Sequence, residues 1–265
     1  MSQEYKFETL CLHAGQEPDP TTNARGVAIH RTSSYVFKST EHAANLFGLK
    51  ELGNIYTRIM NPTQDVLEQR VAALEGGAAA LALSSGTSAI HYAIINICSA
   101  GDEIVSASNL YGGTYTMFDS ILPQFGIQTK FADARDPRSF ESAITDKTRA
   151  IFIETIGNPL LDFTDIGAIS EIARRHHLPL IVDATFTTPF LLRSFDHGAD
   201  IVINSLTKWM GGHGTGIGGI VIDSGKFDWT DPKFKLYNEP DPSYHGLRYA
   251  HDLGDLNPVA FIMRM

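Results

Sequence analysis

The sequence predicts an α/β protein built on a mostly parallel seven-stranded sheet with helices on both faces. Two observations predict this fold: short apolar runs recur through the middle of the chain, and stretches with apolar residues three and four positions apart alternate with them. Strand–helix–strand alternation favours parallel pairing, because each crossover helix brings the chain back to the same end of the sheet. Such helices cover both faces of the sheet.

The predicted elements follow one another in a regular order. The strands are short and mostly apolar, which suits burial on both faces. They are residues 79–83, 103–107, 128–132, 150–154, 179–183, 201–204 and 219–222. The helices between them carry apolar residues at helical spacing and are residues 87–98, 114–125, 137–144 and 165–176.

The two ends of the chain differ from its middle. The first 60 residues contain Pro18, Pro20, Gly26 and Gly53 without strong periodicity, which predicts an extended arm over residues 1–60. The main domain is predicted over 61–258. After Lys226 the pattern weakens into a loop rich in proline and aromatic residues, and residues 259–265 are predicted to begin a further helix.

Composition narrows the class of partner. With 265 residues and 43% hydrophobic content, the chain can bury a large core. Its 21 basic and 30 acidic residues give a formal charge of -9, which argues against nucleic-acid binding and favours a small-molecule partner. Only Cys11 and Cys98 are present, without disulfide or metal-ligand spacing, so a reducing cytoplasm is expected. No apolar run has the length of a signal peptide core or a membrane span.

Polar residues gather where four of the predicted strands end. The segments are residues 84–87, 154–158, 183–185 and 205–208. Ligands of open parallel sheets bind beyond the carboxyl ends of the strands. The four segments are therefore expected to converge on one crevice.

The strongest local feature is the segment 205–214, SLTKWMGGHG, where two hydroxyls precede Lys208 and a glycine-rich turn follows. Hydroxyls beside a lysine suit a phosphate, and a lysine directly after a buried strand is expected to be desolvated, which favours the neutral amine of imine chemistry. Taken alone, a lysine in this place is more often a solvated surface residue. The segment lacks the G-x-x-x-x-G-K order of a nucleotide P-loop.

A second chemical group is Asp183, which ends the apolar run Leu180-Ile181-Val182. A carboxylate in this place can pair with a pyridinium nitrogen, the pairing that lets pyridoxal-5′-phosphate (PLP) accept electrons from a substrate carbanion. The alternative is an ordinary helix N-cap aspartate.

Three weaker signals lie at other strand ends. Residues 84–89, SSGTSA, place small residues at a helix start, where free N–H groups bind phosphate or a hydroxyl simply caps the helix. Asn158 precedes a proline and offers an amide to a cofactor oxygen, although Asn-Pro is also a common turn. Tyr111 offers a ring that can stack on a flat heterocycle, or merely packs. None is specific alone, but five signals at successive strand ends together predict a PLP site.

These residues resemble the Cys/Met-metabolism PLP-dependent enzymes of aminotransferase fold type I, over essentially the whole chain. The resemblance implies that Lys208 binds PLP as a Schiff base, Asp183 pairs with the ring nitrogen, Tyr111 stacks on the ring and Asn158 contacts the phenolic oxygen. It also implies further cofactor-binding residues, with Gly86, Thr87, Ser205 and Thr207 at the phosphate and Ser85 and Thr185 beside them.

The segment 55–63, IYTRIMNPT, resembles the family's YxR element. The resemblance implies that Tyr56 and Arg58 reach the phosphate of a neighbouring subunit. A site shared across a homodimer, commonly within a homotetramer, is therefore expected, with the arm 1–60 contributing to the neighbour's site.

Two parts of the chain resemble the O-acetylhomoserine sulfhydrylases within that family. They are residues 12–20 leading to 32–37, and the post-lysine segments 222–229 and 239–246. The resemblance implies a transferase of methionine biosynthesis (EC 2.5.1 type) that replaces the acetate of O-acetyl-L-homoserine by sulfide to give L-homocysteine. Lys208 would move the protons, and Tyr111, with Tyr56, would assist at the leaving group. Sulfide, methanethiol or cysteine as donor, and acetyl- or succinyl-homoserine as substrate, stay open.

At 265 residues, this chain is shorter than members of the family it resembles. Those members carry a further C-terminal domain that supplies the arginine for the substrate carboxylate. Arg264 is no substitute for that arginine. The chain is therefore expected to be a truncated form that presents the PLP groups but binds an amino acid poorly.

The alternatives within this fold are cystathionine γ-synthase or γ-lyase activity and a catalytically inactive protein. A nicotinamide dehydrogenase is a further alternative, but it would need a G-x-G-x-x-G turn that SSGTSAIH does not supply.

Overall fold

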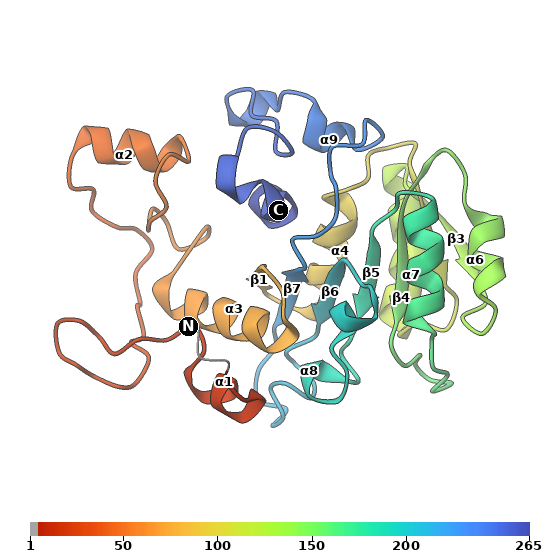
Figure 1. The fold of residues 1–265 in the computed structure, drawn as a ribbon, viewed down its shortest axis with the longest axis horizontal. Coiled ribbons are helices and arrows are strands. Elements are labelled where there is room, and N and C mark those ends of the chain that lie inside the picture. Colours follow the sequence, from red (N-terminus) through yellow and green to blue (C-terminus); the bar gives the residue numbers. More distant parts are fainter. Residues whose placement is uncertain (1–4) are drawn as a thin grey trace. The chain divides into compact units, whose positions relative to one another are not determined.

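The computed structural model describes residues 5–265, and the chain forms two compact units that divide between Leu74 and Glu75 (Figure 1). The first unit contains α1 (Phe7–His13), α2 (Thr40–Phe47) and most of α3 (Pro62–Glu75). Neither α1 nor α2 was predicted from the sequence. Helix α2 begins at Ser39, whose hydroxyl accepts a hydrogen bond from the N–H of His42, as an N-cap serine does.

The irregular part of the first unit is tied to the start of α3 by side chains. Asn61 donates to the carbonyl of His30 at 3.0 Å, and the hydroxyl of Thr63 donates to the carbonyl of Ala28 at 2.8 Å. An isolated bridge joins Ser34 to Tyr56. The extended backbone between α1 and α2 is thus held by its own unit.

The second unit is built on a seven-stranded sheet with the order β1-β7-β6-β5-β4-β2-β3. Only β7 runs antiparallel to its neighbours, β1 and β6; all other pairs are parallel. The strands are β1 (Ala79–Leu83), β2 (Glu103–Ala107), β3 (Gln128–Ala132), β4 (Thr148–Glu154), β5 (Leu180–Asp183), β6 (Ile201–Asn204) and β7 (Gly219–Asp223). The predicted mostly parallel seven-stranded sheet is confirmed.

Helices cover both faces of this sheet. Right-handed crossovers place α4 (Gly86–Ile95) and α5 (Gly112–Thr116), which lead toward β3, on one face. The same rule places α6 (Pro137–Ala143), α7 (Ile166–Arg175) and α8 (Thr188–Leu191), which lead back across the sheet, on the other face. Contacts agree with this division, because α4 touches α5 and α6 touches α7.

One predicted helix, residues 114–125, is broken into three pieces. Helix α5 passes into a π-helical segment, Met117–Ile121, and then into a 3₁₀ turn, Leu122–Phe125, that ends at Gly126 with φ 81°. Pro123 has no N–H to continue the α-helical ladder, which explains the change of hydrogen-bond pattern. The spacing of apolar residues in this helix predicted which face is buried, but it did not predict the change in hydrogen-bond pattern along the helix.

The centre of the sheet is fully buried. Ile151, Phe152 and Ile153 of β4 and Ile181 of β5 have no exposed surface, because a strand with helices on both faces has no solvent side. The ends of these strands are consequently the first places where polar side chains can reach solvent or a ligand.

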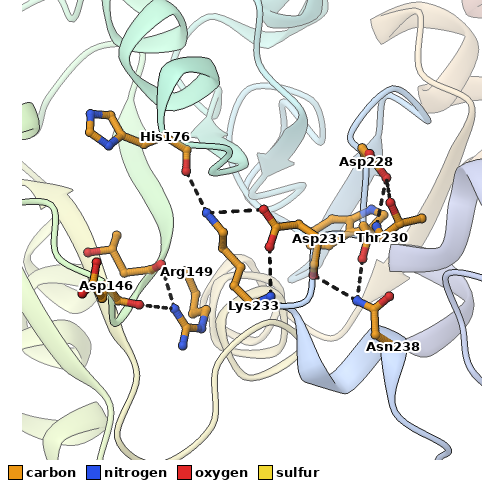
Figure 2. Close-up of polar contacts among 10 residues, drawn as sticks. Asp146, Arg149, His176, Asp228, Thr230, Asp231, Lys233 and Asn238 are labelled. Atoms are coloured by element: carbon orange, nitrogen blue, oxygen red, sulfur yellow. Dashed lines mark hydrogen bonds and ion pairs between the residues drawn. The ribbon is translucent and has the colours of Figure 1, made fainter.

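The segment after β7 forms no strand, as predicted. It contains α9 (Lys235–Asn238), 3₁₀ turns at Pro242–Tyr244 and Gly254–Val259, and α10 (Ala260–Arg264). Figure 2 shows its polar anchors: Lys233 donates to the carbonyl of His176 at the end of α7, and Asn238 donates to carbonyls of the preceding loop. Across residues 5–265, no helix is long and apolar enough to cross a membrane.

Candidate functional site

A cavity of about 540 Å³ lies at the edge of the sheet where the parallel strands end. Ten of the twelve predicted site residues line it: Ser85, Gly86, Thr87, Tyr111, Asn158, Asp183, Thr185, Ser205, Thr207 and Lys208. They follow β1, β2, β4, β5 and β6. These segments were expected to converge because parallel strands end at the same edge of a sheet. In the structure they do lie around one cavity. Tyr56 and Arg58 belong to the first unit.

One wall of the cavity is the start of α4. Ser85 is the N-cap, and its hydroxyl accepts from the N–H of Ser88 at 3.0 Å. A Cβ on Gly86 would lie 2.6 Å from the Cβ of Ser205, so only glycine lets the turn after β6 approach the helix so closely. Free N–H groups of a helix start and a serine hydroxyl therefore share one small region, which suits a phosphate.

The turn after β6 is held by its own hydrogen bonds. The N–H of Ser205 donates to the hydroxyl of Thr185 at 2.8 Å, which connects this turn to the end of β5. The hydroxyl of Thr207 accepts from the N–H of Gly218 at 3.1 Å and donates to its carbonyl at 3.2 Å. Thr185 and Thr207 thereby fix the backbone on which Lys208 is carried.

Lys208 lines the cavity, but its side chain is exposed. The expectation that it is desolvated was wrong for this structure. The buried strand ends at Asn204, and the turn of Ser205, Leu206 and Thr207 carries the lysine away from the core. The amine is therefore accessible to a molecule that enters the cavity.

Asp183 ends β5 and points its carboxyl to the same cavity. One oxygen accepts from the N–H of Thr185 at 2.9 Å. Burial raises the pKa of Asp183, and the hydrogen bonds from Thr185 oppose this rise. Among residues 5–265, no basic side chain forms an ion pair with Asp183. A partly buried carboxyl without a cation suits a ligand that brings positive charge.

Glu154 is a site residue that the sequence analysis did not single out. It ends β4 directly beside Asp183 in the strand register, and only 4% of its surface is exposed. Burial first, and the neighbouring Asp183 second, raise the pKa of Glu154 to about 8. The rule that located Asp183, a carboxylate at the end of an apolar strand, applies equally to Glu154 and could have found it.

Tyr111 and Asn158 stand at the ends of β2 and β4. The Tyr111 ring is half exposed, and the backbone of Gly113 passes so close that a Cβ there would lie 2.6 Å from the ring. A glycine at this position lets the ring pack closely against the start of α5. An aromatic face and the amide of Asn158 are therefore both available in the cavity.

The residues present fit PLP. The cavity combines an accessible amine at Lys208, a carboxyl without a cation at Asp183, an aromatic ring at Tyr111, and a helix start with hydroxyls for an anion. PLP carries the matching groups: an aldehyde, a pyridine nitrogen, a flat ring and a phosphate.

Comparison with known proteins agrees with this geometry. The family model for the Cys/Met metabolism PLP-dependent enzymes matches residues 8–244. The O-acetyl-L-homoserine sulfhydrylase of Leptospira meyeri is 55% identical over 100% of this chain and 61% of its own length. The homocysteine synthase of Schizosaccharomyces pombe is 53% identical over 94% of this chain and 59% of its own. The chain thus spans about three fifths of the length of these relatives.

Solved structures give the same result. A putative O-acetylhomoserine (thiol)-lyase from Campylobacter jejuni, which contains N′-pyridoxyl-lysine-5′-monophosphate, is 40% identical with a TM-score of 0.93, over 98% of this chain and 64% of that one. A cystathionine γ-lyase from Lactobacillus plantarum is 34% identical with a TM-score of 0.77 over the same shares. The chain belongs to the family of Cys/Met metabolism PLP-dependent enzymes.

Proposed function

We propose that this chain holds PLP on Lys208 and serves a γ-replacement in methionine biosynthesis. In this reaction O-acetyl-L-homoserine and sulfide, or methanethiol, give L-homocysteine, or methionine, and acetate. The observation that carries the proposal is the placement of the Lys208 amine and the Asp183 carboxyl on one cavity. The choice of substrate is supported by the names of the relatives that are 55% and 53% identical.

The predicted cofactor-binding residues have separate roles in this proposal. PLP, when bound, supplies an electron sink for a carbanion at the substrate α-carbon. Asp183 keeps a proton on the ring nitrogen by its negative charge, and the first turn of α4 with Ser205 binds the phosphate.

The remaining roles concern protons and orientation. The exposed Lys208 amine would be freed when the substrate amine takes its place on PLP, and it would then take the α-proton and return it at a later position. Tyr111, which lines the cavity, would stack on the ring, and its hydroxyl would donate a proton to the leaving acetate. The amide of Asn158 orients the ring through its phenolic oxygen.

The first unit has a role in trans in this proposal. Tyr56 and Arg58 would reach the phosphate in a neighbouring subunit, so that the working protein is a homodimer or homotetramer. The half-exposed Tyr56 ring and the Arg58 guanidinium lie 5.8 Å apart, a cation–π pair on one face of the unit. The free cysteines Cys11 and Cys98 support a cytoplasmic location.

The first experiment tests the attachment of PLP. The protein is mixed with PLP, the visible absorbance of the lysine imine is recorded, and the mixture is reduced with borohydride for peptide mass spectrometry. We expect a visible band in the wild type and a reduced pyridoxyl adduct on the peptide with Lys208. Lys208→Ala should lose both, whereas Lys147→Ala, at an exposed lysine outside the cavity, should keep both. An equal band in Lys208→Ala and wild type would contradict the proposal.

The second experiment tests the substrate. PLP-loaded protein is given O-acetyl-L-homoserine with sulfide or methanethiol, and homocysteine, methionine and acetate are measured, with O-succinyl-L-homoserine as the competing substrate. We expect acetate to be released together with the thiol product. Formation of 2-oxobutanoate instead would indicate a γ-lyase and would show that the proposed reaction is wrong.

A further inference from the structure

We infer that Glu154 is a positioning residue of the site: its carboxyl joins the segment that carries Tyr111 to the segment that carries Asn158. The inference rests on the proposed PLP site. It assigns to Glu154 no contact with substrate or cofactor. Its task is to keep the ring of Tyr111 and the amide of Asn158 at a fixed separation across the cavity.

The hydrogen bonds of Glu154 support this role. Its Oε1 accepts from the backbone N–H of Tyr111 at 2.8 Å, although the two residues are 43 positions apart in the chain. The backbone N–H of Asn158 is directed at the same carboxyl. The bond from Tyr111 thus joins the segment after β2 to the end of β4 at the wall of the cavity, and the contact with Asn158 orders the turn that follows β4.

Tyr111 has few other local restraints. It is the N-cap of α5, a helix of only five residues, and its side chain makes no capping hydrogen bond. The N–H of Tyr111 would be without an intrahelical acceptor at this position. The carboxyl of Glu154 therefore provides the acceptor that α5 itself does not, and fixes the backbone from which the ring projects.

The two segments also pack directly against each other. A Cβ on Gly157 would lie 2.4 Å from the Asn109 amide nitrogen and 2.5 Å from the Asn109 carbonyl oxygen. Such an approach of two backbones leaves little room for relative motion. Gly157 packs against Asn109, and Glu154 binds the N–H of Tyr111. Because of these two contacts, we expect the Tyr111 segment and the Asn158 segment to move together.

A carboxyl suits this task better than an amide. An ionised carboxylate has acceptor sites on both oxygens and can receive both N–H groups, whereas glutamine has one acceptor oxygen and turns an N–H₂ donor toward the second N–H. The charged groups that face Glu154 are Asp183 on the adjacent strand and Lys208 across the cavity. A bound PLP ring with a protonated nitrogen beside Asp183 would place a positive charge near Glu154 and so favour its ionised form as well.

The test compares PLP binding by wild type, Glu154→Gln and Glu75→Gln in the full chain. Glu75 is a matched control, because it is also buried and its carboxyl also accepts a backbone N–H, from Ser194 at 3.2 Å, but it does not line the cavity. We expect Glu154→Gln to bind PLP roughly tenfold more weakly, the loss of one charge-assisted hydrogen bond, and to have a weaker circular dichroism band of the bound cofactor. Glu75→Gln should resemble wild type in both.

A double-mutant cycle separates positioning from general damage. If Glu154 acts through Tyr111, Glu154→Gln should reduce PLP affinity less in a Tyr111→Ala background than in wild type. Full additivity, or unchanged affinity and dichroism in Glu154→Gln, would overturn the inference. Should Glu154→Gln not fold, Glu154→Asp, which keeps the carboxylate on a shorter chain, carries the same cycle. Failure of wild type itself to bind PLP would instead count against the proposed function.

Discussion

At the scale of single residues, the placement of Asp183 has the clearest electrostatic consequence. Its carboxyl is partly buried and is held by hydrogen bonds from Thr185, while Glu154 lies in register on the neighbouring strand. Two carboxyls at adjacent strand ends repel when both are ionised. A ligand with a protonated ring nitrogen relieves this repulsion, so binding of the ligand and ionisation of the pair favour each other.

Replacement of Asp183 by asparagine tests this electrostatic role. Asp183→Asn keeps the shape and an acceptor for Thr185 but removes the negative charge, so we expect PLP affinity to fall by about tenfold or more. The measurement is a fluorescence or absorbance titration with PLP. Asp200→Asn is the control, because Asp200 likewise accepts a backbone N–H, from Leu180 at 2.9 Å, but lies at the opposite ends of the strands. Equal affinity of Asp183→Asn and wild type would exclude the pairing.

Most of the cavity could be predicted from the sequence, because parallel strands end at one edge and the polar residues after them had recognisable types. Two features could not. The exposure of Lys208 depends on the direction of the turn after β6, which Thr185 and Gly218 fix through space. The role of Glu154 depends on its hydrogen bond to Tyr111, a partner far away in the chain. Neither contact has a local signal.

At the scale of elements, the segment after β7 shows how a chain without strands is still held firmly. Trp229 stacks on Tyr237 with ring centroids 4.4 Å apart and on Phe261 of α10 at 5.5 Å. Lys233 donates to the carbonyl of His176 at 2.8 Å and pairs with Asp231 at 3.7 Å, as Figure 2 shows. Aromatic packing thus holds the segment together, and the hydrogen bond from Lys233 to the His176 carbonyl fastens it to the end of α7.

Asn238 is a polar residue of this segment whose loss we expect to be destabilising. Its amide nitrogen donates to the carbonyls of Trp229, Asp231 and Phe234 at 2.9, 3.1 and 2.9 Å. Asn238→Ala would leave these carbonyls without that donor, and we expect a loss of about 1–3 kcal/mol in the free energy of unfolding. Urea-induced unfolding measures it.

The control for this prediction is Glu171→Ala on the exposed side of α7, which should change stability by no more than about 0.5 kcal/mol. A loss in Asn238→Ala no larger than that of Glu171→Ala would show that the three hydrogen bonds contribute little.

Elements of the sheet domain were predicted more closely than those of the first unit. The strands β1, β2, β3 and β6 begin and end at the predicted residues, although only β2 and β6 are mostly buried. Helices α1 and α2 of the first unit are short, α1 buries no residue, and α2 buries only Leu46. With seven and eight residues, these helices are shorter than the window over which apolar periodicity identifies a helix in a sequence.

At the scale of the whole molecule, buried carboxyls at the amino ends of the parallel strands couple stability to pH. Burial raises the pKa of Glu75 to about 7, and burial together with the neighbouring Asp200 raises that of Asp223 to about 7. Glu75 and Asp223 have no exposed surface, and one oxygen of each has no hydrogen-bond partner within the described chain. These groups are therefore easier to protonate in the folded protein than in the unfolded chain.

The sign of the effect follows from this difference. Below the unfolded-state pKa values, 4.5 for Glu75 and 3.8 for Asp223, both states are protonated and the stabilising contribution is complete. As the pH rises toward 7, the unfolded chain ionises freely while the folded protein does not, so the contribution is progressively lost. Above the folded-state pKa values it changes no further.

We expect the free energy of unfolding to fall between pH 5.5 and pH 8, and Glu75→Gln to make that fall smaller by about 2 kcal/mol. Glutamine does not ionise, so the variant removes the Glu75 contribution to the pH dependence and leaves that of Asp223. Urea-induced unfolding at the two pH values measures the difference, with the exposed Glu171→Gln as control. The same fall in Glu75→Gln as in wild type would show that Glu75 is ionised in the folded protein at pH 5.5, and that water or a counter-charge compensates its burial.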